Sequence, residues 1–312
     1  MPETHYKVLV NPHGGTGSGR KILERIKPVF AAASKQLEVH VTERAGHAAE
    51  LANKLDLSRC EGLCLIGGDG TIHEVINGLM TRDSPTTVPL GIIPGGTGNT
   101  ILQHFDCHDP IDAAKRIVAG ETQPFDIAQV TTNSEVTYCG NVIGWGAFAD
   151  INQLAESWRR LGPSRYSIAA ITYIASPKQR RAKLTLDSQV IEDDFLLIAL
   201  CNTQFTGKGM HLAPSADSAD GKLEVVMVRD ATRFQMLRLF QKIFNGSHVS
   251  LPFVETRQVQ SARIEHEDAD CLTLDGELKG STPASVTVIP SALRIFASPL
   301  DTSQGQRLSS TA

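Results

Sequence analysis

The sequence has little of what a membrane-spanning, secreted or nucleic-acid-binding protein needs. None of its apolar runs reaches the roughly 18–20 residues that cross a bilayer, and the polar start, residues 1–7, lacks the apolar core of a signal peptide. The formal net charge is −4, from 30 basic and 34 acidic residues, which argues against a basic footprint over the whole protein. We therefore expect a cytoplasmic protein with no nucleic-acid partner.

Cysteine spacing gives no sign of a zinc site. Cys60 and Cys64 have no second pair at zinc-binding spacing, and the group His104, Cys107 and His108 lacks a visible fourth ligand. Most of the six cysteines lie in apolar segments, which is typical of buried thiols in a reducing compartment. We therefore interpret the cysteines as structural.

The first part of the chain alternates strand-like and helical patterns. Short apolar runs that end in Gly or Pro alternate with apolar residues at helical spacing. The strands expected here are 8–10, 37–41, 63–66 and 90–93, and the helices are 22–30, 45–55 and 72–80. Continuous apolar strands between helices predict a parallel α/β sheet covered on both faces.

The pattern changes after about residue 126. Short strand-like runs with Gly, Pro or Asp between them now dominate, as in a β-sandwich. Helical segments are expected at about 153–174 and 232–244. We predict a nucleotide-binding α/β domain over 1–128, a β-sandwich domain over 129–300 and a disordered Ser/Thr/Gln-rich tail over 301–312.

Glycine-rich loops follow strands of the α/β part at 11–19, 67–71 and 94–99. Glycines at the carboxyl ends of parallel strands let backbone N–H groups approach phosphate oxygens, and a helix that begins behind the loop adds its positive end. Loops of this kind in one register favour a phosphate site over mere tight turns. The P-loop pattern fails because Arg20 and Lys21 follow 14–19, and the dinucleotide fingerprint fails because its third glycine is missing.

These motifs resemble the diacylglycerol kinase catalytic domain family, which includes bacterial diacylglycerol kinases and eukaryotic sphingosine and ceramide kinases. Residues 67–79 (GGDGTIHEVINGL) resemble its GGDG(T)xxEVxNGL block, and 274–277 (LDGE) resemble its late DGE motif. The other two glycine loops and the segment 210–224 match further blocks, so the resemblance covers about residues 6–297. It implies an N-terminal α/β domain akin to phosphofructokinase and NAD kinase, and a C-terminal β-sandwich.

The resemblance also implies a function and a site. The expected activity is transfer of the γ-phosphate of ATP, with Mg²⁺, to the hydroxyl of a membrane lipid such as diacylglycerol, a sphingoid base or ceramide. Asp69 is expected near Mg²⁺ and Asp275 is expected to be the general base. The implied nucleotide-binding residues are Asn11, Gly15, Thr42, Gly67, Gly68, Asp69, Gly70, Thr71, Glu74, Gly96, Thr97, Gly98, Asn99, Arg159, Arg165 and Glu277.

Further implied positions concern a structural metal and the lipid head. Relatives bind a structural Mg²⁺ at the loop matching Asp217, Asp220 and Lys222, for which a solvated acidic loop is an equal alternative. Sphingosine kinases place an acid where this chain has Asn152. A neutral lipid head group therefore fits better than an ammonium, unless Asp150 substitutes for the missing acid.

Other readings stay open at this stage. An NAD kinase-like enzyme shares GGDGT, and a non-catalytic lipid or nucleotide sensor is a third hypothesis. The amphipathic segment 233–244 and the segment 168–174 could contact a membrane transiently, although a helix packed on the sandwich explains such a stripe equally simply. The sequence does not fix the oligomeric state, and a homodimer is an open option.

Overall fold

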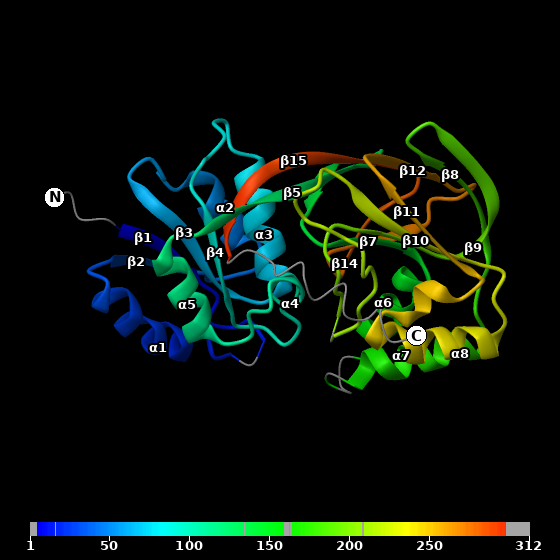
Figure 1. The fold of residues 1–312 in the computed structure, drawn as a ribbon, viewed down its shortest axis with the longest axis horizontal. Coiled ribbons are helices and arrows are strands. Elements are labelled where there is room, and N and C mark those ends of the chain that lie inside the picture. The colour runs from blue at the N-terminus through cyan, green and yellow to red at the C-terminus, as the bar shows by residue number, and fades with distance from the viewer. Residues whose placement is uncertain are drawn as a thin grey trace, which may run out of the picture.

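The first domain is built on a parallel sheet in the order β2–β1–β3–β4, as the apolar strands predict (Figure 1). The computed structural model describes residues 5–15, 17–133, 135–158, 162, 164–207 and 209–297. The strands of this sheet are β1 (His5–Val10), β2 (Gln36–Val41), β3 (Cys60–Gly67) and β4 (Leu90–Pro94). Its helices are α1 (Gly19–Ala32), α2 (His47–Lys54), α3 (Asp69–Met80), α4 (Thr100–His104) and α5 (Pro110–Ala119).

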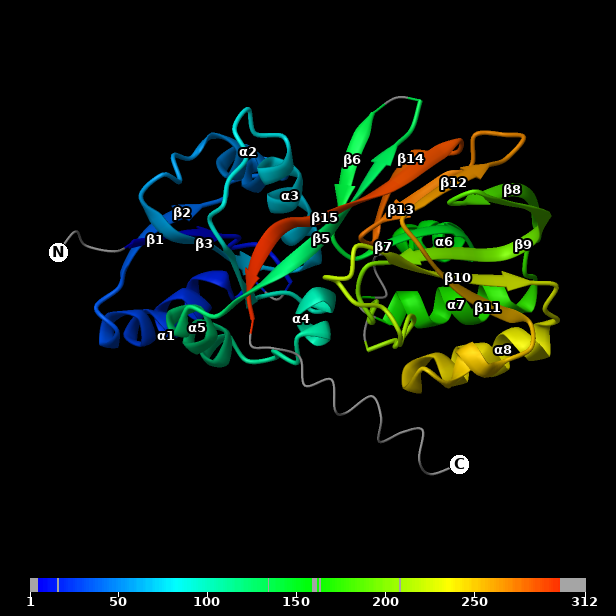
Figure 2. The same ribbon diagram turned by 45° about the horizontal axis from the view of Figure 1, so that its top comes forward.

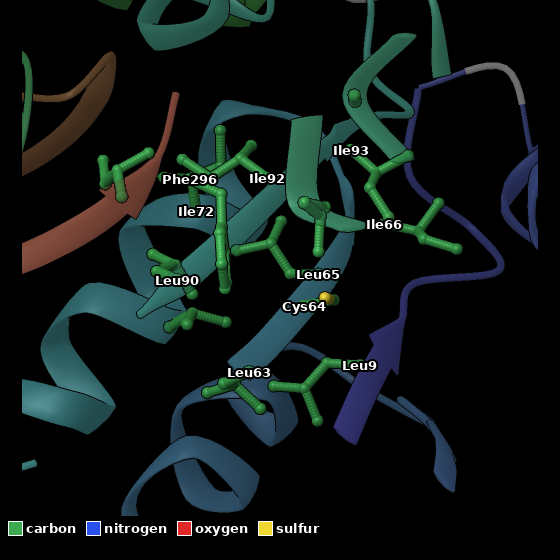
Figure 3. Close-up of a cluster of buried hydrophobic side chains, with 14 of the residues drawn as sticks. Leu9, Leu63, Cys64, Leu65, Ile66, Ile72, Leu90, Ile92, Ile93 and Phe296 are labelled. Atoms are coloured by element: carbon green, nitrogen blue, oxygen red, sulfur yellow. The ribbon is translucent and has the colours of Figure 1, made fainter. Parts of the chain in front are cut away.

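Helices cover both faces of this sheet. α1 and α5 lie on one face, and α2 and α3 lie on the other (Figures 1 and 2). Side chains from β1, β3, β4 and α3 meet in the core, among them Leu9, Leu65 and Ile72 (Figure 3). Because both faces are buried, the central strands are continuously apolar. The carboxyl ends of these strands meet at one edge, where the glycine loops begin.

Long paired strands join the two domains. β5 (Thr122–Thr131) runs antiparallel to β15 (Ala284–Phe296), and both reach from one domain to the other (Figure 2). At its end β15 lies beside β4, with Ile295 paired to Leu90, and Phe296 joins the core of the first domain. The last part of the segment that we assigned to the sandwich therefore packs in the α/β domain.

The second domain is a β-sandwich, so the expected fold class is confirmed. Its apolar core lies between its strands, with Trp145 and Phe195 fully buried. The remaining strands are β6 (Val136–Cys139), β7 (Val142–Gly146), β8 (Arg180–Leu186), β9 (Gln189–Cys201), β10 (Leu223–Arg229), β11 (Val254–Val259), β12 (Ser261–Glu265), β13 (Cys271–Leu274) and β14 (Glu277–Ser281).

Helices pack against the sandwich, and α7 and α8 line its lower side in Figure 2. They are α6 (Ala147–Ser157), α7 (Arg165–Ala175) and α8 (Arg233–Lys242), and the short 3-10 turns η2 (Ile243–Asn245) and η3 (Ser247–Ser250) follow α8. The single helix that we expected over 153–174 is wrong, because α6 and α7 are separate helices. Gly162, with a φ of 61°, lies in the left-handed region between them, a conformation that ends helices.

No helix within the described part of the chain is long and apolar enough to cross a bilayer. The tail that we predicted to be disordered, 301–312, lies outside the described residues.

Candidate active site

The glycine loops pack against one another, backbone to backbone. A β-carbon on Gly15, whose φ is 59°, would lie 2.7 Å from the carbonyl oxygen of Gly95. A β-carbon on Gly96 would overlap Gly68, and the N–H of Gly95 donates to the carbonyl of Gly67 at 2.9 Å. Only glycine allows this approach at Gly15 and Gly96. The loops therefore form one surface made largely of backbone, as a phosphate-binding site requires.

The side chains of this surface link neighbouring elements. Nδ2 of Asn11 donates to Oγ1 of Thr71 at 2.9 Å, and its Oδ1 accepts from the N–H of His13 at 3.0 Å. Thr42 is buried at the end of β2, where its N–H donates to the carbonyl of Val10 at 2.9 Å. The hydrogen bond between Asn11 and Thr71 thus joins the end of β1 to the start of α3 and fixes the first two loops relative to each other.

Asn99 shapes the third loop. It adopts a left-handed conformation with a φ of 51°. Its Oδ1 accepts from the N–H of Gly96 and its Nδ2 donates to the carbonyl of the same residue, both at 3.0 Å. These two hydrogen bonds hold the Asn99 amide within the loop, whereas Thr97 is exposed. The predicted nucleotide contacts of Asn99 and Thr97 stay predictions.

Asp69 is the first residue of α3 and is largely enclosed by the third loop. Its Oδ1 accepts from the N–H and the hydroxyl of Thr100, at 2.7 and 2.8 Å. Its Oδ2 lies so close to Gly98 that a β-carbon there would overlap it. Burial raises the pKa of the Asp69 carboxyl above its ordinary value, Thr100 opposes this effect, and the charge of Asp275 adds to it. No basic side chain in the described ranges forms an ion pair with Asp69.

Glu74 on α3 contacts the start of α2. Its carboxylate accepts from the N–H of Gly46 at 2.9 Å and of Ala48 at 3.2 Å, at the start of α2. A carboxylate at a helix N-terminus stabilises that helix. These contacts give Glu74 a structural role, and its predicted nucleotide contact stays a prediction.

Asp275 lies in the turn between β13 and β14, with a φ of 52° and a side chain only 5% exposed. Its Oδ1 accepts from the N–H groups of Asn141 and Val142, at 2.8 and 3.1 Å. Its Oδ2 accepts from the N–H of Gly140 at 3.1 Å and faces Nδ1 of His73 at 2.9 Å. A carboxylate has about four acceptor positions, and here all of them are used.

His73 is a residue whose part in the site the sequence analysis missed. It lies one turn after Asp69 on α3, on the side of the helix that faces the second domain, and contacts Asp275 across the domain boundary. Asn77 lies on the same face of α3. Its Nδ2 donates to the carbonyl of Tyr138 at 2.8 Å, and its Oδ1 accepts from the N–H of Tyr138 at 2.9 Å. The spacing 69, 73, 77 places these residues on one helical face and is the signal that could have revealed them.

His73, Cys139 and Asp275 form the one group of three metal-ligand types in the described residues whose ligand atoms lie within 4.8 Å of one another. Burial raises the pKa of the Cys139 thiol well above its ordinary value, so the thiol stays protonated. The donors around Asp275 already satisfy its carboxylate. The group is therefore best explained as a hydrogen-bonded cluster.

Asn141 connects the two candidate catalytic carboxylates, and the sequence analysis missed it as well. Its backbone N–H holds Asp275, whereas its Nδ2 donates to Oγ1 of Thr100 at 2.7 Å. The hydroxyl of Thr203 donates to its Oδ1 at 2.5 Å. Since Thr100 holds Asp69, a continuous chain of hydrogen bonds runs from Asp69 to Asp275. No sequence motif singles out this asparagine, because its role depends on the docking of the two domains.

Glu277, the first residue of β14, approaches the start of α3 from the second domain. Its Oε1 lies 3.3 Å from the position that a β-carbon on Gly70 would take. Glu277 is exposed. The predicted nucleotide residues Glu277 and Gly70 are thus brought together, and acidic side chains of both domains meet beside the glycine loops.

The comparisons with known proteins agree with this arrangement. Residues 5–130 match the diacylglycerol kinase catalytic domain, and residues 141–297 match the YegS C-terminal NAD kinase beta sandwich-like domain. A diacylglycerol kinase of Mycobacterium tuberculosis is 30% identical over 92% of this chain and 93% of its own length. The chain belongs to the diacylglycerol kinase catalytic domain family.

Relatives in this lipid kinase family have different substrates in their names. Sphingosine kinase 1 of Arabidopsis thaliana is 27% identical over 87% of this chain and 67% of its own length. Human ceramide kinase is 26% identical over 85% and 63%. The chain thus spans about two thirds of these eukaryotic relatives. A crystal structure from Bacillus anthracis (strain Sterne), of a protein proposed to be a diacylglycerol kinase, matches 95% of this chain with a TM-score of 0.80 and 25% identity.

The residues predicted to face the lipid, Asp150 and Asn152, lie on α6. Nδ2 of Asn152 donates to the carbonyl of Gly276 at 2.5 Å, in the turn that carries Asp275. Oδ1 of Asn152 is buried without a hydrogen-bond partner. Asp150 forms an ion pair with Arg180 at 2.7 Å, and Arg180 also pairs with Asp270 at 2.9 Å, so the charge of Asp150 is compensated in part inside the protein. Asn152 therefore supports the turn that carries Asp275, a role that the sequence did not reveal.

The acidic loop before β10 does not form a compact cluster of carboxylates. Oδ1 of Asp217 accepts from the N–H of Ala219 at 3.0 Å, and Oδ1 of Asp220 accepts from the N–H of Lys222 at 2.9 Å. All three predicted metal residues, Asp217, Asp220 and Lys222, are exposed, and within the described ranges the two carboxylates belong to no group of three His, Cys, Asp or Glu side chains close enough to share a metal ion. A structural Mg²⁺ here stays a prediction that would depend on backbone carbonyls.

The predicted phosphate-binding arginines lie around the loop between α6 and α7. Arg165 donates to the carboxylate of Glu156 at 2.8 Å and to the hydroxyl of Tyr166 at 3.1 Å. Arg159 lies outside the described residues. The phosphate contact of Arg165 stays a prediction, because its guanidinium is engaged by α6.

Proposed function

We propose that this lipid kinase transfers the γ-phosphoryl group of ATP to the hydroxyl of a lipid with an uncharged head, such as diacylglycerol or ceramide. One observation carries the proposal. Asp69 at the glycine loops and Asp275 in the sandwich are joined through Thr100 and Asn141 into one network across the domain boundary. A reaction between a nucleotide on one domain and a lipid on the other requires such an arrangement.

The glycine loops are proposed to hold the phosphates of ATP. Their interlocked backbones and the start of α3 offer N–H groups and a positive helix end, which stabilise negative charge. This accounts for affinity without a P-loop lysine. Phosphoryl transfer asks the protein mainly for positioning and electrostatic stabilisation.

Asp69 fits a magnesium ion. Its carboxylate is largely enclosed, has no basic partner among the described residues and has a pKa raised by burial. Such an anion is stabilised by a hard dication, which takes oxygen ligands. When bound with ATP, Mg²⁺ would neutralise charge on the phosphates. Thr100 fixes one oxygen of Asp69, and Gly98 leaves room for the other.

In the proposed reaction, the lipid hydroxyl oxygen forms a bond to the γ-phosphorus while the bond to the β–γ bridging oxygen breaks. ADP leaves with that electron pair, and the hydroxyl proton passes to a carboxylate. Asp275 remains the proposed acceptor. Three of its four donors are backbone N–H groups and the fourth is His73. The His73 contact is therefore the one that can open without moving the main chain.

The preference for an uncharged head rests on α6. An ammonium head would need an unpaired anion nearby, because a buried unpaired charge costs several kcal/mol. Asn152 is neutral, and Asp150 is not a free anion, because one of its oxygens pairs with Arg180, which also pairs with Asp270. The unpartnered Oδ1 of Asn152 can accept a hydrogen bond from a neutral polar head.

A panel of acceptors tests this function. The enzyme is incubated with γ-labelled ATP and Mg²⁺, and with diacylglycerol, ceramide, sphingosine or NAD. The proposal expects label in the organic phase, with a higher kcat/KM for diacylglycerol or ceramide than for sphingosine. Label in NADP alone would support an NAD kinase-like enzyme, and label in no product would support a sensor.

A further inference from the structure

Asp275 is saturated with hydrogen bonds in this structure, although a general base needs a free lone pair to take a proton. Its donors are the N–H groups of Gly140, Asn141 and Val142 and the ring nitrogen Nδ1 of His73. An ionised carboxylate only accepts, so Nδ1 carries a hydrogen and donates it to Oδ2 at 2.9 Å. A hydroxyl that is to reach this carboxylate must therefore replace one of these donors.

The backbone donors are fixed by partners of their own. The carbonyl of Gly140 accepts from Nδ2 of Asn202 at 2.9 Å, and the carbonyl of Asn141 accepts from the N–H of the same residue at 2.8 Å. The carbonyl of Val142 accepts from the N–H of Asp275 at 2.8 Å, so this segment and the turn of Asp275 hold each other. Withdrawal of a backbone donor would thus break further hydrogen bonds.

His73 is the only side-chain donor to Asp275 in the described part of the chain, and apart from that contact its ring is held loosely. Its second ring nitrogen, Nε2, has a long contact of 3.4 Å with Nδ2 of Asn77. A ring nitrogen of His73 also lies within 4.8 Å of Sγ of Cys139, and a thiol sulfur is a weak acceptor. A turn of the ring therefore opens Oδ2 at the cost of one hydrogen bond, with the sulfur as a neighbour for the released N–H.

The pair of His73 and Asp275 is shielded from water. Their side chains are 9% and 5% exposed, and with His73 in place every lone pair of the carboxylate is engaged. A water molecule that enters the site then finds no acceptor on the base. This matters because water competes with an alcohol as the acceptor of a phosphoryl group, and active sites suppress such hydrolysis by excluding water.

We propose that His73 covers the base against water and yields its place on Oδ2 of Asp275 to the hydroxyl of the lipid. A lipid is held at the site by the rest of its molecule, so its hydroxyl can replace one hydrogen bond, whereas a water molecule has no such further contact. The inference rests on the proposed function, because it takes Asp275 as the proton acceptor. His73 acts through Asp275 and is therefore a positioning residue.

Removal of the cover leads to a defined side reaction. In His73→Ala, Oδ2 of Asp275 is open, and the shortened side chain leaves room for a water molecule beside it. The water oxygen forms a bond to the γ-phosphorus while the bond to the β–γ bridging oxygen breaks, and ADP leaves with that electron pair. Oδ2 takes one proton of the water and later releases it to solvent.

The test measures phosphate release from ATP with Mg²⁺ in the absence of lipid, and phosphoryl transfer to diacylglycerol, in the unmodified chain and three variants. His73→Ala removes the donor. His73→Asn is the conservative variant, because its amide nitrogen, like Nδ1, is attached to Cγ and can donate to Oδ2. His104→Ala is a matched control, since His104 is also buried at the domain boundary, where it contacts Ser218 and Gln204 instead. Melting curves check that the variants are folded.

The proposal expects His73→Ala to raise lipid-free ATP hydrolysis about tenfold or more, because a base that reaches the attacking oxygen contributes roughly 10²–10⁴-fold. The ratio of hydrolysis to lipid phosphorylation should rise in His73→Ala, return toward the unmodified value in His73→Asn and stay unchanged in His104→Ala. An unchanged ratio in His73→Ala, including an equal loss of both reactions, would overturn the proposal. So would an equal rise in His104→Ala.

A second measurement keeps the side chain in place. In the unmodified chain labelled with ¹⁵N-histidine, the Nδ1 signal of His73 is assigned by its absence in His73→Asn. Addition of a dispersed short-chain diacylglycerol with a nonhydrolysable ATP analogue should shift this signal, because Nδ1 loses its carboxylate partner. A signal that stays in place at saturating lipid would contradict the exchange, even where His73→Ala does not fold.

Failure of this proposal and failure of the kinase proposal give different results. If the unmodified chain labels no lipid, the kinase proposal fails, and phosphate release by His73→Ala still decides whether His73 covers Asp275. If the unmodified chain labels lipid but His73→Ala hydrolyses ATP no faster than it does, the kinase proposal stands and the cover is refuted.

Discussion

Replacement of Asp275 by Asn tests whether this carboxylate organises the domain boundary as well as the chemistry. The carboxylate accepts from three backbone N–H groups and one histidine nitrogen, and its side chain is 5% exposed. In Asp275→Asn, the amide oxygen can still accept from Asn141 and Val142. The amide nitrogen then faces the N–H of Gly140, which cannot find another acceptor.

The cost follows from these contacts. An unsatisfied buried N–H costs about 1–3 kcal/mol, and the loss of charge weakens the remaining bonds, so the total is roughly 2–4 kcal/mol. At about 2–4 °C per kcal/mol for a chain of this size, Asp275→Asn should lower Tm by roughly 4–16 °C. In this variant, the His73 tautomer with an unprotonated Nδ1 can accept a hydrogen bond from the new amide nitrogen. We therefore assign no separate cost to His73.

The assay compares melting temperatures of the unmodified chain, Asp275→Asn and Glu277→Gln. Glu277 is exposed in the same hairpin, so its neutralisation removes a charge of the same sign without a buried network and should barely change Tm. In steady-state kinetics, Asp275→Asn should lower kcat far more than it changes ATP affinity. Equal melting temperatures for Asp275→Asn and Glu277→Gln would refute the structural reasoning.

Other changes give further expectations. Burial raises the folded-state pKa of Asp69, so ionised Asp69 lowers the stability of the folded protein at pH values above the unfolded-state pKa near 3.8. Asp69→Asn should therefore raise Tm at pH 7, and this gain should disappear near and below pH 4. The same variant should be inactive. A Tm gain that persists at pH 3 would contradict this. Gly98→Ala places a β-carbon on Oδ2 of Asp69 and should lower kcat by roughly tenfold or more with little change in Tm; an unchanged kcat would show that this oxygen does not act. Asn152→Asp should shift the kcat/KM ratio toward sphingosine, but it also places a carboxylate against the carbonyl of Gly276 and should lower kcat for every lipid; a parent enzyme that prefers sphingosine would refute our reading of Asn152.

The general fold was predictable from the sequence because its signals are local. Continuous apolar strands that end in Gly or Pro identified the parallel sheet, and short punctuated strands identified the sandwich. The break between α6 and α7 was missed, because Gly162 and Pro163 were outweighed by the apolar pattern on both sides. The return of β15 to the first core was missed as well, since strand pairing over long sequence separation leaves no local pattern.

The site was predictable only in part, for a related reason. The glycine loops, Asp69 and Asp275 belong to motifs that can be read from neighbouring residues. His73 acts through Asp275 on the other domain, 202 residues away along the chain, and Asn141 acts through Thr100 on the first domain, 41 residues away. Their roles exist only after the domains dock. Asn152 likewise reads as a specificity residue in sequence, but its hydrogen bond to Gly276 adds a structural role.

The central claim is that a carboxylate at the glycine loops directs phosphate from ATP onto a lipid hydroxyl. The most direct measurement incubates the unmodified chain and Asp69→Ala with γ-labelled ATP, Mg²⁺ and vesicles that contain diacylglycerol, and then counts label in the extracted lipid. We predict labelled phosphatidic acid from the unmodified chain and almost none from a folded Asp69→Ala. Equal labelling by the two proteins, or no labelled lipid from either, would contradict the account.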